Sequence, residues 1–229
     1  MKKLIAALAI ATALSPLGAA QAGTISFQSS KAMSPTNWTD VLSFDKFDSN
    51  LGTLTSIRFD LSGIVQGAGN AESLDGSAST VTLSLGSRLE LTRPDKTRLV
   101  VTNPLFTQVF NFSAFDGNIN FGGTSGASTG TVSADGADFF ISSDAADFGL
   151  FSALGGGKIN LGVHASGASS GTGAGNLITL FNTSAAATAK VTYIYQDAVA
   201  EVSEPASLAT MFAGLGLIAA LRRRKGKQA

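Results

Sequence analysis

The stretch Thr-Val-Thr-Leu-Ser-Leu-Gly-Ser-Arg-Leu-Glu-Leu, residues 80–91, decides the fold class. Its apolar side chains all stand at odd-numbered positions: Val81, Leu83, Leu85, Leu89 and Leu91. Successive side chains of a β-strand point to opposite faces, so this alternation places every apolar side chain on one face. The stretch therefore predicts a half-buried β-strand.

The same alternation recurs on both sides of this stretch. Ile57, Phe59 and Leu61 share one face of the segment 53–65. Segments 158–164 and 190–195 alternate in the same way, and shorter candidates cover 24–28, 38–44, 98–101, 106–112, 139–142 and 177–181. About ten short strands between Asn-, Asp-, Gly- and Ser-rich turns predict an all-β fold, an antiparallel β-sandwich or jelly roll. The low-complexity segments 122–136 and 166–176 are expected to be flexible loops, or adaptable binding loops at one end of the sandwich.

The composition of the whole chain excludes several classes of protein. Its 229 residues contain no Cys and one His, which excludes disulfide scaffolds, Cys-ligated metals, thiol catalysis and multi-His metal sites. Residues 23–200 carry nine basic and fourteen acidic side chains, with no basic stripe that would bind nucleic acid. We therefore expect one folded domain with flanking segments and no nucleic-acid partner.

The first 22 residues have the pattern of a secretory signal peptide. Lys2 and Lys3 precede an apolar run over 4–14, and Ala20-Gln21-Ala22 is a small-residue cleavage site. We expect export through the secretion machinery, followed by cleavage between Ala22 and Gly23 by signal peptidase.

The C-terminus combines an apolar segment with a basic end. Residues 206–221 carry no charge and precede the cluster Arg222, Arg223, Arg224 and Lys225. A helix of this length would span about 24 Å, somewhat less than the ~30 Å hydrocarbon core of a bilayer. A buried helix would need a polar face, which this segment lacks. We expect a transmembrane helix over 206–221 and a cytoplasmic basic tip over 222–227.

Ser203-Glu204-Pro205, the apolar segment and the Arg-rich tip together resemble the PEP-CTERM sorting signal, the substrate tail of exosortases. Ser203 stands where the family has its first Pro. The resemblance covers residues 203–229. It implies that a membrane protease-transpeptidase of the exosortase type recognises the tail and cuts near the motif, in the setting of exopolysaccharide, biofilm or floc matrices.

A second resemblance covers most of residues 24–196. The segments 44–48 (FDKFD), 51–55 (LGTLT), 78–83, 121–126 and 191–195 are similar to choice-of-anchor domains of the E type, which precede bacterial sorting tails. This resemblance implies a surface role without an assigned activity. On physical grounds, residues 51–54 are expected to form a tight turn at Gly52 that leads into a half-buried strand.

Few residues are candidates for chemistry. His164 lies on the polar face of its expected strand, which is typical of a surface residue. Structural Ca²⁺ is the one metal considered, because its ligands are carboxylate and carbonyl oxygens. The candidate ligands are Asp75, Asp116 and Asp135, each followed by Gly, with Asp138, Asp144 and Asp147 nearby. Asp-Gly is also common in turns, so we expect no metal site, with structural Ca²⁺ as the alternative. We expect no catalytic residue and no other cofactor.

Aromatic side chains leave a second function open. Trp38, Tyr193 and Tyr195 could stack on sugar rings, which would make the domain a carbohydrate-binding or adhesion module associated with exopolysaccharide. A hydrolase with paired carboxylates is a weaker alternative, because sequence spacing does not distinguish a catalytic pair from solvated Asp residues.

These features together predict three regions: a signal peptide over 1–22, a β-sandwich over 23–198 and a sorting signal over 199–229. We expect a non-enzymatic structural protein of the cell surface or extracellular matrix. It would be held in the inner membrane as a single-span intermediate until an exosortase-type enzyme processes its tail.

Overall fold

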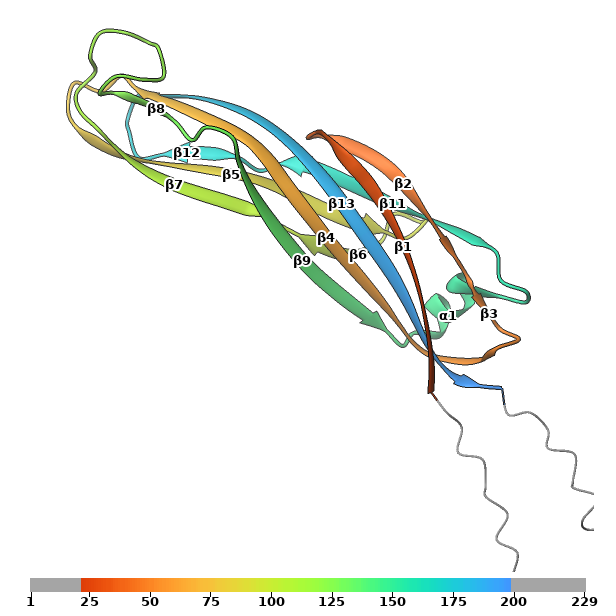
Figure 1. Ribbon diagram of the computed structural model, residues 1–229. Helices are drawn as coiled ribbons and strands as arrows, with labels where there is room; N and C mark the ends of the chain where they lie inside the picture. Colours follow the sequence, from red (N-terminus) through yellow and green to blue (C-terminus); the bar gives the residue numbers. More distant parts are fainter. Residues whose placement is uncertain (1–21, 199–229) are drawn as a thin grey trace, which may run out of the picture. The chain divides into compact units, whose positions relative to one another are not determined.

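A computed structural model describes residues 22–198 of the chain. Of these residues, 69% lie in strands and 4% in a helix. They form two mostly antiparallel sheets packed face to face (Figure 1), which confirms the predicted β-sandwich. Within this part of the chain, no helix is long and apolar enough to cross a membrane, and the segment 206–221 lies outside it.

The first sheet is built around its two longest strands. β13 (Leu177–Asp197) lies between β1 (Ala22–Pro35) and β4 (Gly52–Ser73). The other side of β4 pairs with β9 (Val132–Ser142) and with β8 (Gly126–Ser128). Ala22 is the register partner of Gln196, so the start of β1 and the end of β13 lie side by side at one end of the domain. We call this the proximal end and the opposite one the distal end.

The second sheet is built around β5 (Ser79–Thr92). One side of β5 pairs with β7 (Leu105–Phe112) and then β6 (Arg98–Thr102). The other side pairs with β12 (Ser170–Thr172) and then β11 (Lys158–Gly167). β2 (Trp38–Asp45) completes the sheet beside β11.

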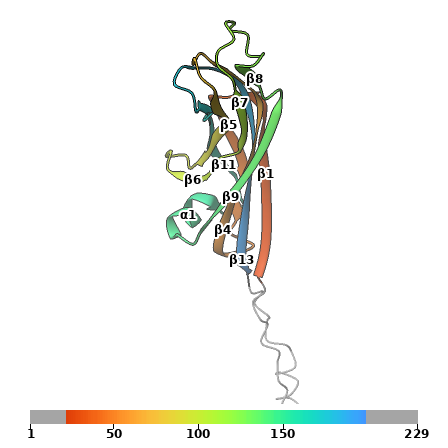
Figure 2. The same cartoon turned by 90° about the vertical axis from the view of Figure 1, so that its left-hand side faces the viewer.

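Three short elements lie near the proximal end. β3 (Phe47–Asp48) and β10 (Ser152–Ala153) form a parallel pair. The helix α1 (Ala145–Phe151) begins after Asp144, whose carboxylate accepts a hydrogen bond from the Ala146 backbone N–H. Figure 2 shows α1 and β6 on one side of the sandwich and β1 on the other.

The core lies between the sheets, on the face that the alternation predicts. Ile57, Phe59 and Leu61 of β4 are fully buried, as are Val81, Leu83 and Leu85 of β5. The main apolar cluster fills the proximal half of the sandwich. A smaller cluster in the distal half contains Ala71, Val81, Leu83 and Phe112.

The strands reach further than the alternation predicts, and the prediction of loops over 122–136 and 166–176 is wrong in part. The first segment contains β8 and the start of β9, and the second contains the end of β11 and β12. β13 likewise joins two separate candidates into one strand. Gly, Ser, Ala and Thr carry little hydrophobic alternation, but the edges of β4 and β5 still offer their backbones hydrogen-bond partners. Backbone pairing, which leaves no such pattern, therefore extends these strands.

Candidate functional site

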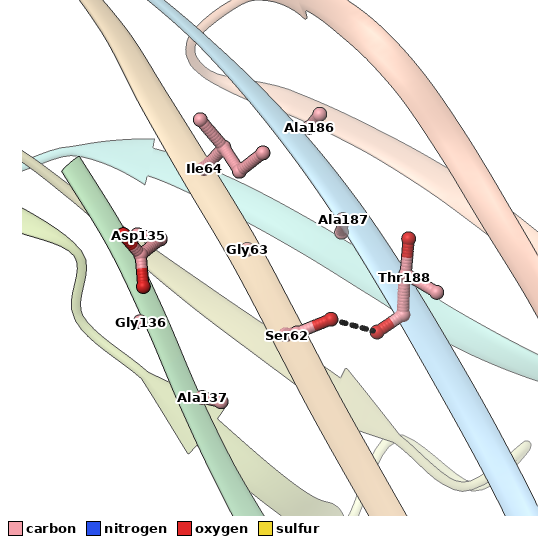
Figure 3. A pocket seen from close by; sticks show the side chains of 9 residues that line it. All are labelled: Ser62, Gly63, Ile64, Asp135, Gly136, Ala137, Ala186, Ala187 and Thr188. Carbon is pink, nitrogen blue, oxygen red and sulfur yellow. Dashed lines mark hydrogen bonds between the residues drawn. The ribbon is translucent and has the colours of Figure 1, made fainter. Parts of the chain in front are cut away.

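A shallow hollow of about 250 Å³ lies on the outer face of the first sheet. Figure 3 shows it where β9, β4 and β13 run side by side. The Asp135 carboxylate stands at one side, and the Ser62 hydroxyl donates a hydrogen bond of 3.4 Å to the Thr188 carbonyl oxygen. The remaining lining residues are Gly63, Ile64, Gly136, Ala137, Ala186 and Ala187. The floor of the hollow is thus mostly backbone and small side chains.

Two glycines in this floor are explained by packing on the inner face. Gly63 and Gly136 are register partners on β4 and β9. A Cβ at Gly63 would lie 1.7 Å from Leu89 Cδ1, and one at Gly136 would lie 2.8 Å from Thr102 Oγ1. Both glycines are therefore required by the close approach of the second sheet.

A second hollow of about 240 Å³ adjoins the first and shares Ser62 and Ala137 with it. The Arg58 guanidinium carbon lies 3.8 Å from the centre of the Phe139 ring, a cation–π contact. Arg58 also donates from Nε to Asp60 Oδ1 at 2.8 Å. The ring of Phe139 stays half exposed. We call the two hollows together the sheet groove.

The sheet groove offers a recognisable chemistry. Its hydroxyl and carboxylate oxygens can accept hydrogen bonds from ligand hydroxyl groups, while the free part of the Phe139 ring can pack against an apolar face. The groove is open along the sheet, so it suits an extended ligand better than an enclosed small molecule.

His164 is exposed on the surface of β11, as predicted. Its Nδ1 lies 3.0 Å from Thr39 Oγ1 on the neighbouring strand β2. This contact is a cross-strand pair on a solvated sheet face.

Two of the candidate aspartates organise loops at the distal end. The Asp75 carboxylate accepts hydrogen bonds from the backbone N–H groups of Gly175 and Asn176, at 2.7 and 2.9 Å. The Asp116 carboxylate accepts from the backbone N–H groups of Asn118 and Thr124, at 2.9 and 3.4 Å. Both carboxylates therefore hold the chain to itself.

The other four candidate aspartates lie in separate places. Asp135 lines the sheet groove, Asp138 accepts from the backbone N–H of Phe139, and Asp144 caps α1. Asp147 is paired with Arg93. Within residues 22–198, no three His, Cys, Asp or Glu side chains gather where they could share a metal ion.

The three aromatics proposed to stack on sugar rings do not form a platform. Tyr193 is fully buried, and its hydroxyl donates to the Asp45 carbonyl oxygen at 2.9 Å. Burial raises the pKa of Tyr193 above the ordinary tyrosine value. Tyr195 packs against Phe47, and Trp38 Nε1 donates to the Ala185 carbonyl oxygen at 3.1 Å. The prediction is wrong for Tyr193, which belongs to the core, whereas Trp38 and Tyr195 are partly buried at its margin.

Glu72 is a buried acidic residue that the sequence did not single out. Its carboxylate accepts hydrogen bonds from the backbone N–H groups of Asn120 and Phe121, at 3.2 and 2.7 Å, and from the Ser125 hydroxyl at 2.6 Å. These contacts hold the distal loop 113–125 against the end of β4. A carboxylate within the Gly- and Ala-rich stretch 67–73 that ends β4 is the one signal that could have indicated this role.

The residues of the two predicted processing sites fall in different parts of the chain. Ala22 and Gly23 begin β1, opposite Gln196 and Tyr195. Ser203, Glu204, Pro205, the segment 206–221 and the basic tip with Arg222, Arg223, Arg224 and Lys225 lie outside the described residues.

Comparisons with known proteins give no family for this chain. No family model and no curated protein matches it. Among solved structures, the infectious bursal disease virus Gx strain is 14% identical over 95% of this chain, with a TM-score of 0.17. The VP2 subviral particle of the same virus is 12% identical over 94% of this chain, with a TM-score of 0.20. The chain spans about half the length of these two viral chains.

Proposed function

We propose that the chain is an exported, non-enzymatic structural protein of the cell surface or extracellular matrix. Signal peptidase removes residues 1–22, and residues 206–221 then hold the protein in the inner membrane as a single-span intermediate. An exosortase-type enzyme recognises the tail and cuts near Ser203-Glu204-Pro205.

One structural observation carries this proposal. Ala22 and Gln196 are register partners at the proximal end, so both predicted sorting segments join the domain at the same place. The loops 74–78 and 113–125 lie at the opposite end (Figure 1). A domain tethered in this way has its distal loops at the end opposite to the tether. This arrangement suits a protein that is displayed on a surface.

The strand order supports a jelly-roll form of the sandwich. The first sheet runs β1-β13-β4-β9 and the second runs β2-β11-β5-β6, with β8, β7 and β12 extending these rows distally. The pairs β1 and β2, and β4 and β5, are consecutive strands in opposite sheets. Double-sheet folds of this kind leave few free edges and serve widely as building blocks and binding modules.

Intact mass spectrometry of the protein from its native host tests the proposal. We expect a species that begins at Gly23 and ends near Ser203-Glu204-Pro205. A species running from Gly23 to Ala229, found only in the membrane fraction, would reject processing. Replacing Arg222, Arg223 and Arg224 with Gln should make the uncut protein accumulate. Lys96→Gln, in the exposed turn between β5 and β6, is the control that should leave processing unchanged.

Carbohydrate binding is a second candidate function, and the sheet groove is the observation that favours it. The half-exposed Phe139 ring lines one hollow of the groove together with Asp60 and Ser62, and Asp135 lines the adjoining hollow. Phe139→Ala should then abolish retention on a glycan array, while Val109→Ala, an exposed apolar change on the other sheet, should not. Absence of any bound glycan from the array would reject this candidate.

A further inference from the structure

Two turns at the proximal end are fastened to each other. The Ser49 backbone N–H donates to the Ala153 carbonyl oxygen at 3.1 Å, and the Gly155 N–H donates to the Asp48 carboxylate at 2.9 Å. The Leu51 N–H closes the first turn on the Asp48 carbonyl oxygen at 3.1 Å. The turns that follow β3 and β10 are therefore joined directly, and the short parallel pair between these strands joins them as well.

This unit carries exposed leucines. Leu154 is 81% exposed, the highest value among the large hydrophobic residues that the structure describes, and Leu51 is 43% exposed. The Gly156 N–H donates to the Ala153 carbonyl oxygen at 3.1 Å, and Gly155 has a φ of 76°. Leu154 therefore occupies the second position of a tight turn, where its side chain projects away from the sheet. We call Leu51, Leu154 and their two turns the leucine tip.

A partly apolar hollow lies beside the leucine tip. It has a volume of about 360 Å³ and is lined by Phe47, Leu54 and Phe148 together with Ser and Thr side chains. Two exposed leucines on joined turns, with a partly apolar hollow beside them, form a surface that another apolar body can cover.

We infer that the leucine tip rests on the lipid surface while the protein is held in the membrane. This inference rests on the proposed function, and it adds a second contact beside the tail. Gly52, which follows Leu51, is the register partner of Asp197, so the tip lies next to the strand from which the tail departs. The apolar segment 206–221 begins nine residues after Asp197. Nine residues reach at most about 30 Å, so a lipid surface at the start of that segment lies within reach of the tip.

The charges near the leucine tip indicate that its contact with lipid is apolar and not electrostatic. Two lysines, Lys46 and Lys158, and two aspartates, Asp45 and Asp48, lie near the leucine tip. Lys158 is paired with Asp45 at 2.7 Å, so the surface has no excess of cations for anionic headgroups. The contact is therefore made by leucine side chains entering the interfacial region, and it does not depend on lipid charge.

The absence of Cys from the chain allows a direct test on the full-length protein. Leu154→Cys and the control Ile119→Cys, which is 58% exposed in the distal loop, are each labelled with the fluorophore NBD and reconstituted into phosphatidylcholine vesicles. We expect blue-shifted emission at residue 154 that lipid-attached quenchers reduce several-fold. Emission at residue 119 should be that of the probe in water and insensitive to these quenchers.

Carbonate extraction distinguishes failure of the lipid contact from failure of the membrane anchor on which this inference rests. Water-like emission at residue 154, in protein that resists carbonate extraction, would overturn the lipid contact and leave the membrane anchor standing. Protein released by carbonate would overturn the anchor and the lipid contact together. Vesicles that contain phosphatidylglycerol should give the same spectrum at residue 154. A shift that appears only with this anionic lipid would contradict the leucine contact.

Discussion

Arg93 and Asp147 form a two-point ion pair that fastens α1 to the turn between β5 and β6. Arg93 Nε lies 2.7 Å from Asp147 Oδ1, and a terminal guanidinium nitrogen lies 2.8 Å from Oδ2. The Asp147 side chain is 6% exposed and that of Arg93 is 19% exposed. The hydrogen bonding from Arg93 lowers the pKa of Asp147 below its ordinary value of 3.8, and Ser142 makes a smaller contribution in the same direction.

Breaking this ion pair should destabilise the domain. Arg93→Met leaves a buried carboxylate without its partner, which should cost about 3 kcal/mol of unfolding free energy in urea titrations at pH 7. Lys158→Met breaks the exposed pair with Asp45 and is the matched control, expected to cost below about 1 kcal/mol. Equal costs for the two variants would contradict the assigned role of the Arg93–Asp147 pair.

The same pair should contribute to the pH dependence of stability. The Asp147 pKa is lower in the folded state than in the unfolded state, so the pair stabilises the fold above about pH 4. This contribution is lost as pH falls through the folded-state pKa. Asp147→Asn should therefore lose less unfolding free energy than the wild type between pH 6 and pH 2, measured by urea titration at each pH. An unchanged slope would mean that other carboxylates carry the acid sensitivity.

Glu72 should control the order of the distal loop. Both carboxylate oxygens of Glu72 accept hydrogen bonds, but a glutamine side chain has one oxygen and one NH₂ group. Glu72→Gln must therefore lose the bond from either the Ser125 hydroxyl or a backbone N–H, which should lower the unfolding free energy by about 2 kcal/mol. Hydrogen exchange should accelerate at the amides of Asn120 and Phe121. Asp75→Asn provides the crossed control, because it should accelerate exchange only at Gly175 and Asn176. Faster exchange at all four amides in either variant would indicate global destabilisation instead.

Leu83 should be a core residue of the distal half. Its side chain is 1% exposed and belongs to the small cluster with Val81 and Phe112. Leu83→Ala should lower the unfolding free energy by about 2–5 kcal/mol. Leu180→Ala removes the same atoms from a side chain that is 55% exposed and should cost below about 0.5 kcal/mol. A negligible cost for Leu83→Ala would show that the distal cluster adds no stability.

Gly63 and Leu89 should be energetically coupled. A Cβ at Gly63 would collide with Leu89, so Gly63→Ala should cost about 1–3 kcal/mol by overpacking. In the double variant with Leu89→Ala the collision disappears, and the total cost should be smaller than the sum of the two single costs. Gly76→Ala, where a Cβ would meet nothing within 4 Å, is the control expected to be neutral. Strict additivity would contradict the packing explanation for Gly63.

The fold was predictable wherever one face of a strand carries large apolar side chains. Ile57, Phe59 and Leu61 are all buried on one face of β4, as their spacing predicts. β8 and β12 escaped detection because Gly, Ser, Ala and Thr produce no contrast between two faces. The turn before the strand lies earlier than predicted: the Leu51 N–H closes it on the Asp48 carbonyl oxygen, and Gly52 is already the first residue of β4.

The sheet groove and the leucine tip could not be predicted, because both depend on which strands become neighbours. Asp135 and Thr188 share the groove only because β4 lies between β9 and β13. Leu51 and Leu154 share a tip only because β3 pairs with β10. The sugar-stacking prediction failed for a different reason. The alternation over 190–195 already places Tyr193 on the same face as Val191, and both side chains are fully buried, so the residue type was weighted above the pattern.

The position of β13 determines how the domain bears mechanical force. This strand is 21 residues long, lies between β1 and β4, and ends where the tail begins. Its hydrogen bonds run across the strand axis, so tension from an anchored tail to the distal loops loads two ladders in shear. Bonds loaded together in shear must break almost simultaneously, whereas an edge strand that is peeled loses them one at a time. If the tail is anchored as proposed, attachment through β13 would let the whole sandwich resist the pull, because the domain would not unzip from one end.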